Sequence, residues 1–162
     1  MDLQRAQKIA DGIIEKLKPY CLRRDDGYVY IEIAGSVRRK RPFPRDIDLV
    51  LIPSDPWNLN YEIASLGQVP VKGGKIQRIN HDGVQVDLYF AEPKTWATLL
   101  LIRTGSAQNN IRLASLAKRK GWHLKASGDG LFDENGQRIA GETEESIFEA
   151  LGIPYQRPEA RG

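Results

Sequence analysis

The first third of the chain alternates between helical and strand-like spacing of its hydrophobic residues. Apolar positions recur every three or four residues from Leu3 to Leu17, and Pro19 follows, which predicts a helix ending near that point. Tyr28–Ala34 is rich in aromatic and β-branched residues, and Ile47–Ile52 is a short apolar run. Both segments predict strands.

The middle of the chain has the pattern of one helix followed by a hairpin. Pro56 precedes Trp57–Leu66, which we expect to be helical. Lys75–Asn80 and Val84–Phe90 are then separated by a segment containing Asp82-Gly83, a dipeptide typical of tight hairpin turns. We therefore expect two antiparallel strands here.

The pattern changes after Pro93. Helical spacing replaces strand-like spacing, and Gly-containing turns separate short apolar pieces. The elements expected there are a helix over Thr95–Ile102, a second helix between Gly105 and Lys120, three short strands between Trp122 and Gly141, and a helix from Thr143 to Gly152. We therefore predict an α+β fold in two parts, residues 1–92 with a mixed β-sheet and residues 93–162 with helices and a small sheet.

Composition narrows the classes of protein that this sequence can represent. The chain has 162 residues with a formal net charge of +3, which permits a polyanionic partner without requiring one. Its longest apolar run, Leu99–Ile102, is far below the ~20 residues of a membrane-spanning helix. Cys21 is the only cysteine, so disulfides within the chain and multi-cysteine zinc sites are excluded. An intracellular, cytoplasmic location is the simplest interpretation.

Three aspartates interrupt hydrophobic strands. Asp46 and Asp48 are two residues apart, so they project from the same face of a strand, and Asp87 lies among apolar residues in a strand that can be its neighbour. Carboxylates crowded in this way need a compensating cation, and Mg²⁺ prefers oxygen ligands. Three such aspartates can hold two ions in phosphoryl or nucleotidyl transfer. The alternative is that each aspartate lies at an exposed strand end.

A Gly-Ser turn with basic residues stands between the first two expected strands. Gly35 lets backbone N–H groups approach a phosphate, and Ser36 adds a hydroxyl donor. Arg38 and Arg39 can donate paired hydrogen bonds to phosphate oxygens. A lone Gly-Ser pair is weak support for a phosphate site, but the strand carboxylates that follow strengthen it.

Four motifs in order carry a resemblance to a known family. "GSVRR", "RDIDLV", "VQVDLYF" and "RTGS", with the tail "GLFDENGQRIAGETEESIFEALGIPY", resemble the nucleotidyltransferase superfamily and, more closely, DNA polymerase family X, the polymerase beta-like family. The chain is similar to the minimal palm-plus-thumb form of bacterial and small viral members. The resemblance implies a nucleotidyltransferase palm over residues 1–92 and a thumb over residues 93–162.

The resemblance also implies roles for individual residues. Asp46, Asp48 and Asp87 would ligate two divalent ions, Mg²⁺ or Mn²⁺, and Asp87 would also accept the proton of the primer 3′-hydroxyl. Residues expected to bind the nucleotide triphosphate are Gly35, Ser36, Arg38, Arg39, Arg45, Gly105 and Asn110. Residues expected to contact DNA are Arg103 and Arg112 and, from their positive charge alone, Lys72, Lys75, Arg78, Lys118 and Arg119. The alternative for each of these last five is an ordinary solvated charged surface.

The sequence departs from the family pattern at several positions. Ile102 and Arg103 replace an aromatic pair that helps to select deoxyribose, so the choice of sugar is open. Gln85 stands where polymerase beta has an arginine that orients the third aspartate. Pro44 replaces a small polar residue near the phosphates, and Ala114 replaces a template-facing arginine, so fidelity is open as well.

The leading hypothesis is a metal-dependent, template-directed DNA polymerase that fills short gaps in DNA repair. It would act as a monomer on gapped or primer–template DNA with deoxynucleoside triphosphates, away from membranes. We expect neither a lyase module before Leu3 nor a phosphoesterase module after Gly162. One alternative is a template-independent or ribonucleotide-preferring nucleotidyltransferase. A second is an inactive nucleic-acid-binding module, which the joint presence of three aspartates, Ser36 and Arg39 disfavours.

Overall fold

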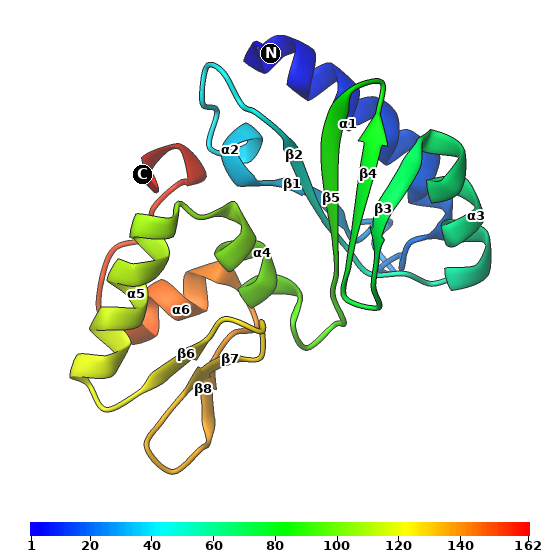
Figure 1. The fold of residues 1–162 in the computed structure, drawn as a ribbon. Coiled ribbons are helices and arrows are strands. Elements are labelled where there is room, and N and C mark those ends of the chain that lie inside the picture. The colour runs from blue at the N-terminus through cyan, green and yellow to red at the C-terminus, as the bar shows by residue number, and fades with distance from the viewer.

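A five-stranded mixed sheet forms the centre of the first part of the molecule. The computed structural model describes every residue from Met1 to Gly162 (Figure 1). The strand order is β1-β2-β5-β4-β3, with β2 and β5 parallel and all other neighbours antiparallel. The elements of this part are α1 (Leu3–Leu17), β1 (Ile31–Ala34), α2 (Gly35–Arg38), β2 (Ile47–Leu51), α3 (Pro56–Leu66), β3 (Gln68–Lys72), β4 (Ile76–His81) and β5 (Val84–Phe90).

Helices α1 and α3 cover one face of this sheet (Figure 1). Asp2 caps the start of α1 by accepting a hydrogen bond from the Arg5 backbone N–H, and the apolar face of the helix is buried. Leu49 and Leu88 lie opposite each other on β2 and β5 and are fully buried in the same core. Because side chains alternate along a strand, Asp48 and Asp87 project from the other face.

Helix α4 (Trp96–Thr104) packs against that second face. Leu99 and Leu100 from α4 join Val50 and Ile52 of the β2 segment in a separate buried cluster. This packing places the C-terminal end of α4, with Thr104, near α2. The second part of the chain is therefore attached to the sheet on the side that carries the aspartates.

The second part combines helices with a three-stranded sheet in the order β6-β7-β8. Its core is formed by apolar residues of α4, α5, α6 and the sheet, with Phe148 fully buried. Thr143 caps α6 through a reciprocal hydrogen-bond pair with Ser146. The elements that follow α4 are α5 (Ala107–Arg119), β6 (His123–Lys125), β7 (Gly130–Phe132), β8 (Arg138–Ala140), α6 (Glu144–Leu151) and a final 3₁₀ turn over Pro158–Ala160.

Most elements lie where the hydrophobic pattern predicts them, with four differences. The strand expected from Tyr28 is regular only over Ile31–Ala34. The Gly-Ser turn is the start of a one-turn helix, α2, and Asp46 directly precedes β2 instead of lying within it. Strand β3 is not predicted by the sequence, because its run is short and contains Pro70, and its residues are mostly exposed. None of the helices is long and apolar enough to cross a membrane.

Candidate active site

The parallel pairing of β2 with β5 brings the aspartates together. Asp48 and Asp87 are direct partners across the two strands, and Ala34 at the end of β1 pairs with Asp48 from the other side. Asp46 lies two residues before Asp48, directly before the same strand. Asp87 is only 4% exposed, whereas Asp46 and Asp48 are partly exposed, so the cluster is partly buried with one side open to solvent.

The protein environment disfavours the ionised forms of two of the three aspartates. Burial, followed by the charges of Asp46 and Asp87, raises the pKa of Asp48 to about 7. Burial and the charge of Asp87 also raise the pKa of Asp46. Both shifts have the sign expected when carboxylates share a partly buried site without a cation. The alternative of three independent, exposed strand ends is therefore wrong.

Arg78 is the partner of the third aspartate. Its Nε donates to Asp87 Oδ1 at 2.8 Å, and its Nη2 lies 3.4 Å from Asp87 Oδ2. Gln85 Nε2 donates to Asp87 Oδ2 at 3.3 Å. Arg78 was expected to bind DNA, whereas its guanidinium is turned toward the carboxylate cluster.

Gly35 lies directly against Asp48. Its φ of +59° is in the left-handed region, and a Cβ at this position would overlap the Asp48 carboxylate. Only glycine therefore lets the start of α2 approach the cluster so closely. Ser36, half-buried in the first turn of α2, follows at once.

Arg39 reaches from the end of α2 to the turn after α4. Its Nη1 donates to the Thr104 carbonyl at 2.6 Å, and a Cβ on Gly105 would lie 3.1 Å from the same nitrogen. Burial, together with the nearby charge of Arg41, lowers the pKa of Arg39. Its Nε is buried and has no hydrogen-bond partner within the protein. An unused buried donor in this place suits an anionic ligand.

Arg38 differs from the expectation that it binds the triphosphate. Its Nη1 donates to Thr104 Oγ1 and Glu144 Oε2, both at 2.8 Å, and its Nη2 donates to Glu144 Oε1 at 2.6 Å. Arg161 Nη1 donates to Glu144 Oε2 at 2.7 Å. Because these donors are already paired with a carboxylate, Arg38 belongs to an internal ion-pair network that joins α2 to the second part of the chain.

This network was not predicted from the sequence. Glu144 reads as an ordinary acid in the first turn of a helix, and Arg161 is the second-last residue of the chain. In the structure Arg161 is fully buried, and its guanidinium carbon lies 5.3 Å from the Phe148 ring centre. No local pattern indicates such a contact, because its partners are far apart in sequence.

Three other residues with predicted roles have contacts inside the protein. Asn110 donates from Nδ2 to the Ile102 carbonyl at 2.8 Å, while its Oδ1 is buried without a partner. Arg112 donates to Gln156 Oε1 at 2.8 Å. Arg103 stacks over the Tyr89 ring at 4.2 Å and lowers the pKa of Asp48 through its charge. Arg103 therefore lies beside the carboxylates.

The remaining basic residues with predicted roles make no observed contact with the carboxylate cluster. They are exposed side chains without carboxylate partners, so their roles stay predictions. These residues are Arg45, Lys72, Lys75, Lys118 and Arg119.

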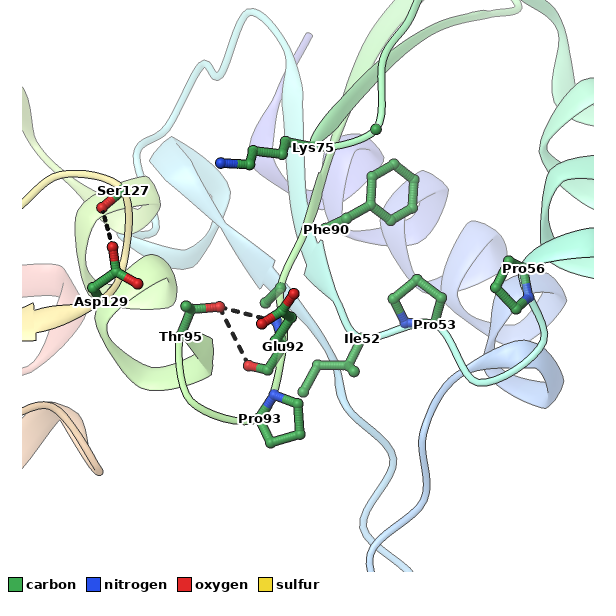
Figure 2. Close-up of a pocket in the computed structure, with 12 residues that line it drawn as sticks. Ile52, Pro53, Pro56, Lys75, Phe90, Glu92, Pro93, Thr95, Ser127 and Asp129 are labelled. Atoms are coloured by element: carbon green, nitrogen blue, oxygen red, sulfur yellow. Dashed lines mark hydrogen bonds between the residues drawn. The ribbon is translucent and has the colours of Figure 1, made fainter.

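A pocket of about 480 Å³ lies at the far end of β5, between Phe90 and the loop that carries Ser127 and Asp129 (Figure 2). Ser127 donates to Asp129 at 2.7 Å across one wall. Lys75 borders the pocket, but Glu92 and Asp129 do so as well, and none of the three central aspartates lines it. This mixture of charges is poorly suited to a triphosphate, so the aspartate cluster remains the candidate active site.

The oxygen ligands of the aspartates are of the type that a hard divalent ion prefers. In this structure, however, no three Asp, Glu, His or Cys side chains lie close enough together to form a complete metal site. The donors are all carboxylate oxygens, the type that Mg²⁺ and Mn²⁺ prefer. The raised pKa of Asp48 shows negative charge that a cation would offset. The donor set is therefore of the chemical type that fits a divalent ion.

Comparisons with known proteins agree with this geometry. The family profile described as "DNA polymerase beta thumb" matches residues 99–162. DNA polymerase/3′-5′ exonuclease PolX of Bacillus subtilis is 24% identical over 135 residues, which cover 79% of this chain and 23% of that protein. DNA polymerase lambda of Rattus norvegicus is 31% identical over 86 residues, which cover 48% of this chain and 15% of that protein. The chain thus spans about a quarter or less of these curated relatives.

Solved structures confirm the predicted α+β, polymerase beta-like fold. The ternary P/T complex of Leishmania infantum polymerase beta matches with a TM-score of 0.80 at 23% identity, covering 100% of this chain and 76% of that one. The ternary gap complex of the same polymerase also gives 0.80, at 22% identity, covering 99% and 70% of the two chains. The thumb profile and the two curated polymerase relatives agree with the resemblance to DNA polymerase family X, the polymerase beta-like family, and the solved structures show the fold.

Proposed function

We propose that this chain is a metal-dependent, template-directed DNA polymerase that adds nucleotides to a primer 3′-hydroxyl in short gaps during DNA repair. The observation that carries the proposal is the pairing of Asp48 with Asp87, directly beside the glycine-led turn of α2. This pairing sets carboxylates for divalent ions next to donors for a triphosphate. Residues 1–92 then act as the palm and residues 93–162 as the thumb.

Asp46, Asp48 and Asp87 would hold two divalent ions, Mg²⁺ or Mn²⁺. When bound, such ions lower the pKa of an attacking hydroxyl and neutralise the charge of a phosphate leaving group. The carboxylates supply oxygen ligands and exclude competing anions by their own charge. Asp87, the most buried of the three, would accept the proton of the primer 3′-hydroxyl.

The residues of α2 and the α4–α5 turn would bind the incoming nucleotide. Ser36 and Arg39, whose Nε has no hydrogen-bond partner within the protein, would bind the β and γ phosphates. Gly105 lies close to the Arg39 guanidinium, and Asn110 follows it in α5, so these two residues would lie near the sugar and base. The new bond joins the primer 3′-oxygen to the α-phosphorus, and the bond from that phosphorus to pyrophosphate breaks.

The polymerase relatives and the modest positive charge support DNA as the partner. Exposed basic side chains near the ends of α5 and the β3–β4 turn, such as Lys118 and Lys72, would contact its phosphates. We further propose that the protein acts as a monomer in the cytoplasm.

A second candidate is an enzyme of the same type that accepts ribonucleotides. Ile102 packs against the core of the second part of the chain, so its side chain is not free to stand against a 2′-hydroxyl. The enzyme would then accept ribonucleotides as well as deoxynucleotides, unless another residue excludes the 2′-hydroxyl.

The Asp87→Asn variant tests whether the protein is an enzyme or only a DNA-binding module. We expect nucleotide addition to a gapped primer to fall about 10²–10⁴-fold. DNA affinity, measured by fluorescence anisotropy, should stay unchanged or rise slightly because a negative charge near phosphate is lost. Asp82→Asn, in the exposed turn of the same hairpin, is the matched control and should retain activity. Equal activity of Asp87→Asn and wild type would contradict the proposal.

A further inference from the structure

Arg78 meets the most buried carboxylate of the cluster from a different strand. It lies on β4 directly opposite Asp87 on β5, in antiparallel register. Its bond from Nε to Oδ1 is short, at 2.8 Å, whereas both contacts to Oδ2 are long, at 3.4 Å from Arg78 and 3.3 Å from Gln85. Arg78 thus fixes one carboxylate oxygen and leaves the other able to take a stronger ligand.

The other arginines near the cluster contact groups other than Asp87. Arg103 lies over Tyr89 and acts on Asp48, and Arg39 is bonded to the Thr104 carbonyl. Gln85 is uncharged and makes only the long contact. Arg78 is therefore the cation that holds Asp87, and its charge also reaches Asp46.

Resting on the proposed function, we propose that Arg78 is a positioning residue for Asp87. A carboxylate that binds a metal ion is usually held by a hydrogen-bond donor outside the first layer of ligands, and loss of that donor weakens metal binding or activity. The fork of an arginine suits this role better than the single ammonium of a lysine. Arg78 acts through Asp87 and does not contact the reacting atoms.

Two other roles for Arg78 predict different effects of its removal on DNA affinity and on metal binding. As a phosphate contact, Arg78 would contribute to DNA affinity like Lys75, which lies at the start of the same hairpin and has no carboxylate partner. As a competing cation that merely fills the ion site, Arg78 would repel divalent ions. Its removal would then strengthen metal binding.

Binding of Mn²⁺ to the DNA-free protein, followed by electron paramagnetic resonance of the unbound ion, separates these roles. We expect Arg78→Ala to weaken Mn²⁺ binding about 10–100-fold and Arg78→Lys to recover only part of this loss. The double variant Arg78→Ala/Gln85→Arg should regain at least about tenfold, because position 85 already reaches Asp87 Oδ2. Lys75→Ala is the matched control and should leave Mn²⁺ binding unchanged. Unchanged or tighter binding in Arg78→Ala would overturn the proposal.

Nucleotide addition and DNA binding give the second readout. We expect Arg78→Ala to lower kcat about 10–100-fold, with the nucleotide KM and the DNA Kd changed by less than about twofold. A loss of DNA affinity in step with kcat would overturn the positioning role. If the wild-type protein adds no nucleotide, the proposed function fails, and the Mn²⁺ measurement still decides the role of Arg78. Arg78→Lys, which keeps the charge, provides a folded variant if Arg78→Ala does not fold.

Discussion

Replacing Glu144 by glutamine should destabilise the protein strongly, because Glu144 is the shared partner of two arginines. Its carboxylate accepts hydrogen bonds from Arg38 at 2.6 and 2.8 Å and from Arg161 at 2.7 Å. Arg161 is fully buried, and the side chains of Glu144 and Arg38 are only 9% and 20% exposed. The variant would leave buried guanidinium charge without a counter-charge.

The size of the effect follows from this burial. Removing one partner of a buried ion pair costs about 3–5 kcal/mol, a large share of the ~5–15 kcal/mol that stabilises a typical domain. For a chain of this length the melting temperature should fall by about 6–20 °C. Since the network joins α2 to the second part of the chain, the alignment of Ser36 and Arg39 with the α4–α5 turn should loosen as well.

The pH dependence of this effect has a definite sign. Burial alone would raise the pKa of Glu144, but hydrogen bonds and charges from Arg38 and Arg161 outweigh it and lower the pKa below the ordinary value of 4.5. A lowered carboxyl pKa contributes stability above the unfolded-state pKa, and that stability is lost as the pH falls through the folded-state pKa. The difference between wild type and Glu144→Gln should therefore be full at pH 7 and shrink below about pH 4.5.

Urea unfolding followed by circular dichroism measures this difference. Glu149→Gln, on the exposed side of the same helix, is the matched control and should change the unfolding free energy by less than about 0.5 kcal/mol. A Glu144→Gln protein within about 1 kcal/mol of wild type at pH 7 would refute the reasoning, because the network would then contribute no more than an exposed ion pair.

Two further predictions concern the carboxylate cluster. Gly35→Ala should lower the free energy of unfolding by about 1–2 kcal/mol because of its left-handed backbone, and it should also abolish nucleotide addition. Gly83→Ala has a similar φ but open space around it, so it should lower the unfolding free energy and retain nucleotide addition. Urea unfolding measures the first effect and primer extension measures the second. Because the pKa of Asp48 is raised to about 7, Mn²⁺ must displace a proton at lower pH, so its affinity should fall about tenfold per pH unit below that value. Paramagnetic resonance titrations that show no change between about pH 5.5 and 7 would contradict this assignment.

The aspartates can be identified from the sequence because a charged residue in an apolar strand differs clearly from its neighbours. The sequence also predicts that Asp87 lies on a strand next to that of Asp48, and the register confirms this. Gly35 was assigned to close backbone approach, and its contact with Asp48 supplies the reason. Such features are local, and strand periodicity makes them visible.

Contacts between distant segments could not be predicted in this way. Arg38 and Arg39 are adjacent and chemically alike, yet Arg38 pairs with Glu144 whereas Arg39 keeps an unused donor. Their difference depends on where α6 and the C-terminal residues pack. The sequence likewise predicts only a DNA contact for Arg78, because it does not show which residue Arg78 faces on the neighbouring strand.

Extension of a primer across a one-nucleotide gap tests the central claim most directly. Each deoxynucleotide and ribonucleotide would be offered separately opposite each of the four template bases, with Mg²⁺ and then Mn²⁺, and Asp87→Asn would serve as the blank. We predict that addition follows the template base and disappears in the variant. Addition without regard to the template base, or equal addition by the variant, would contradict it.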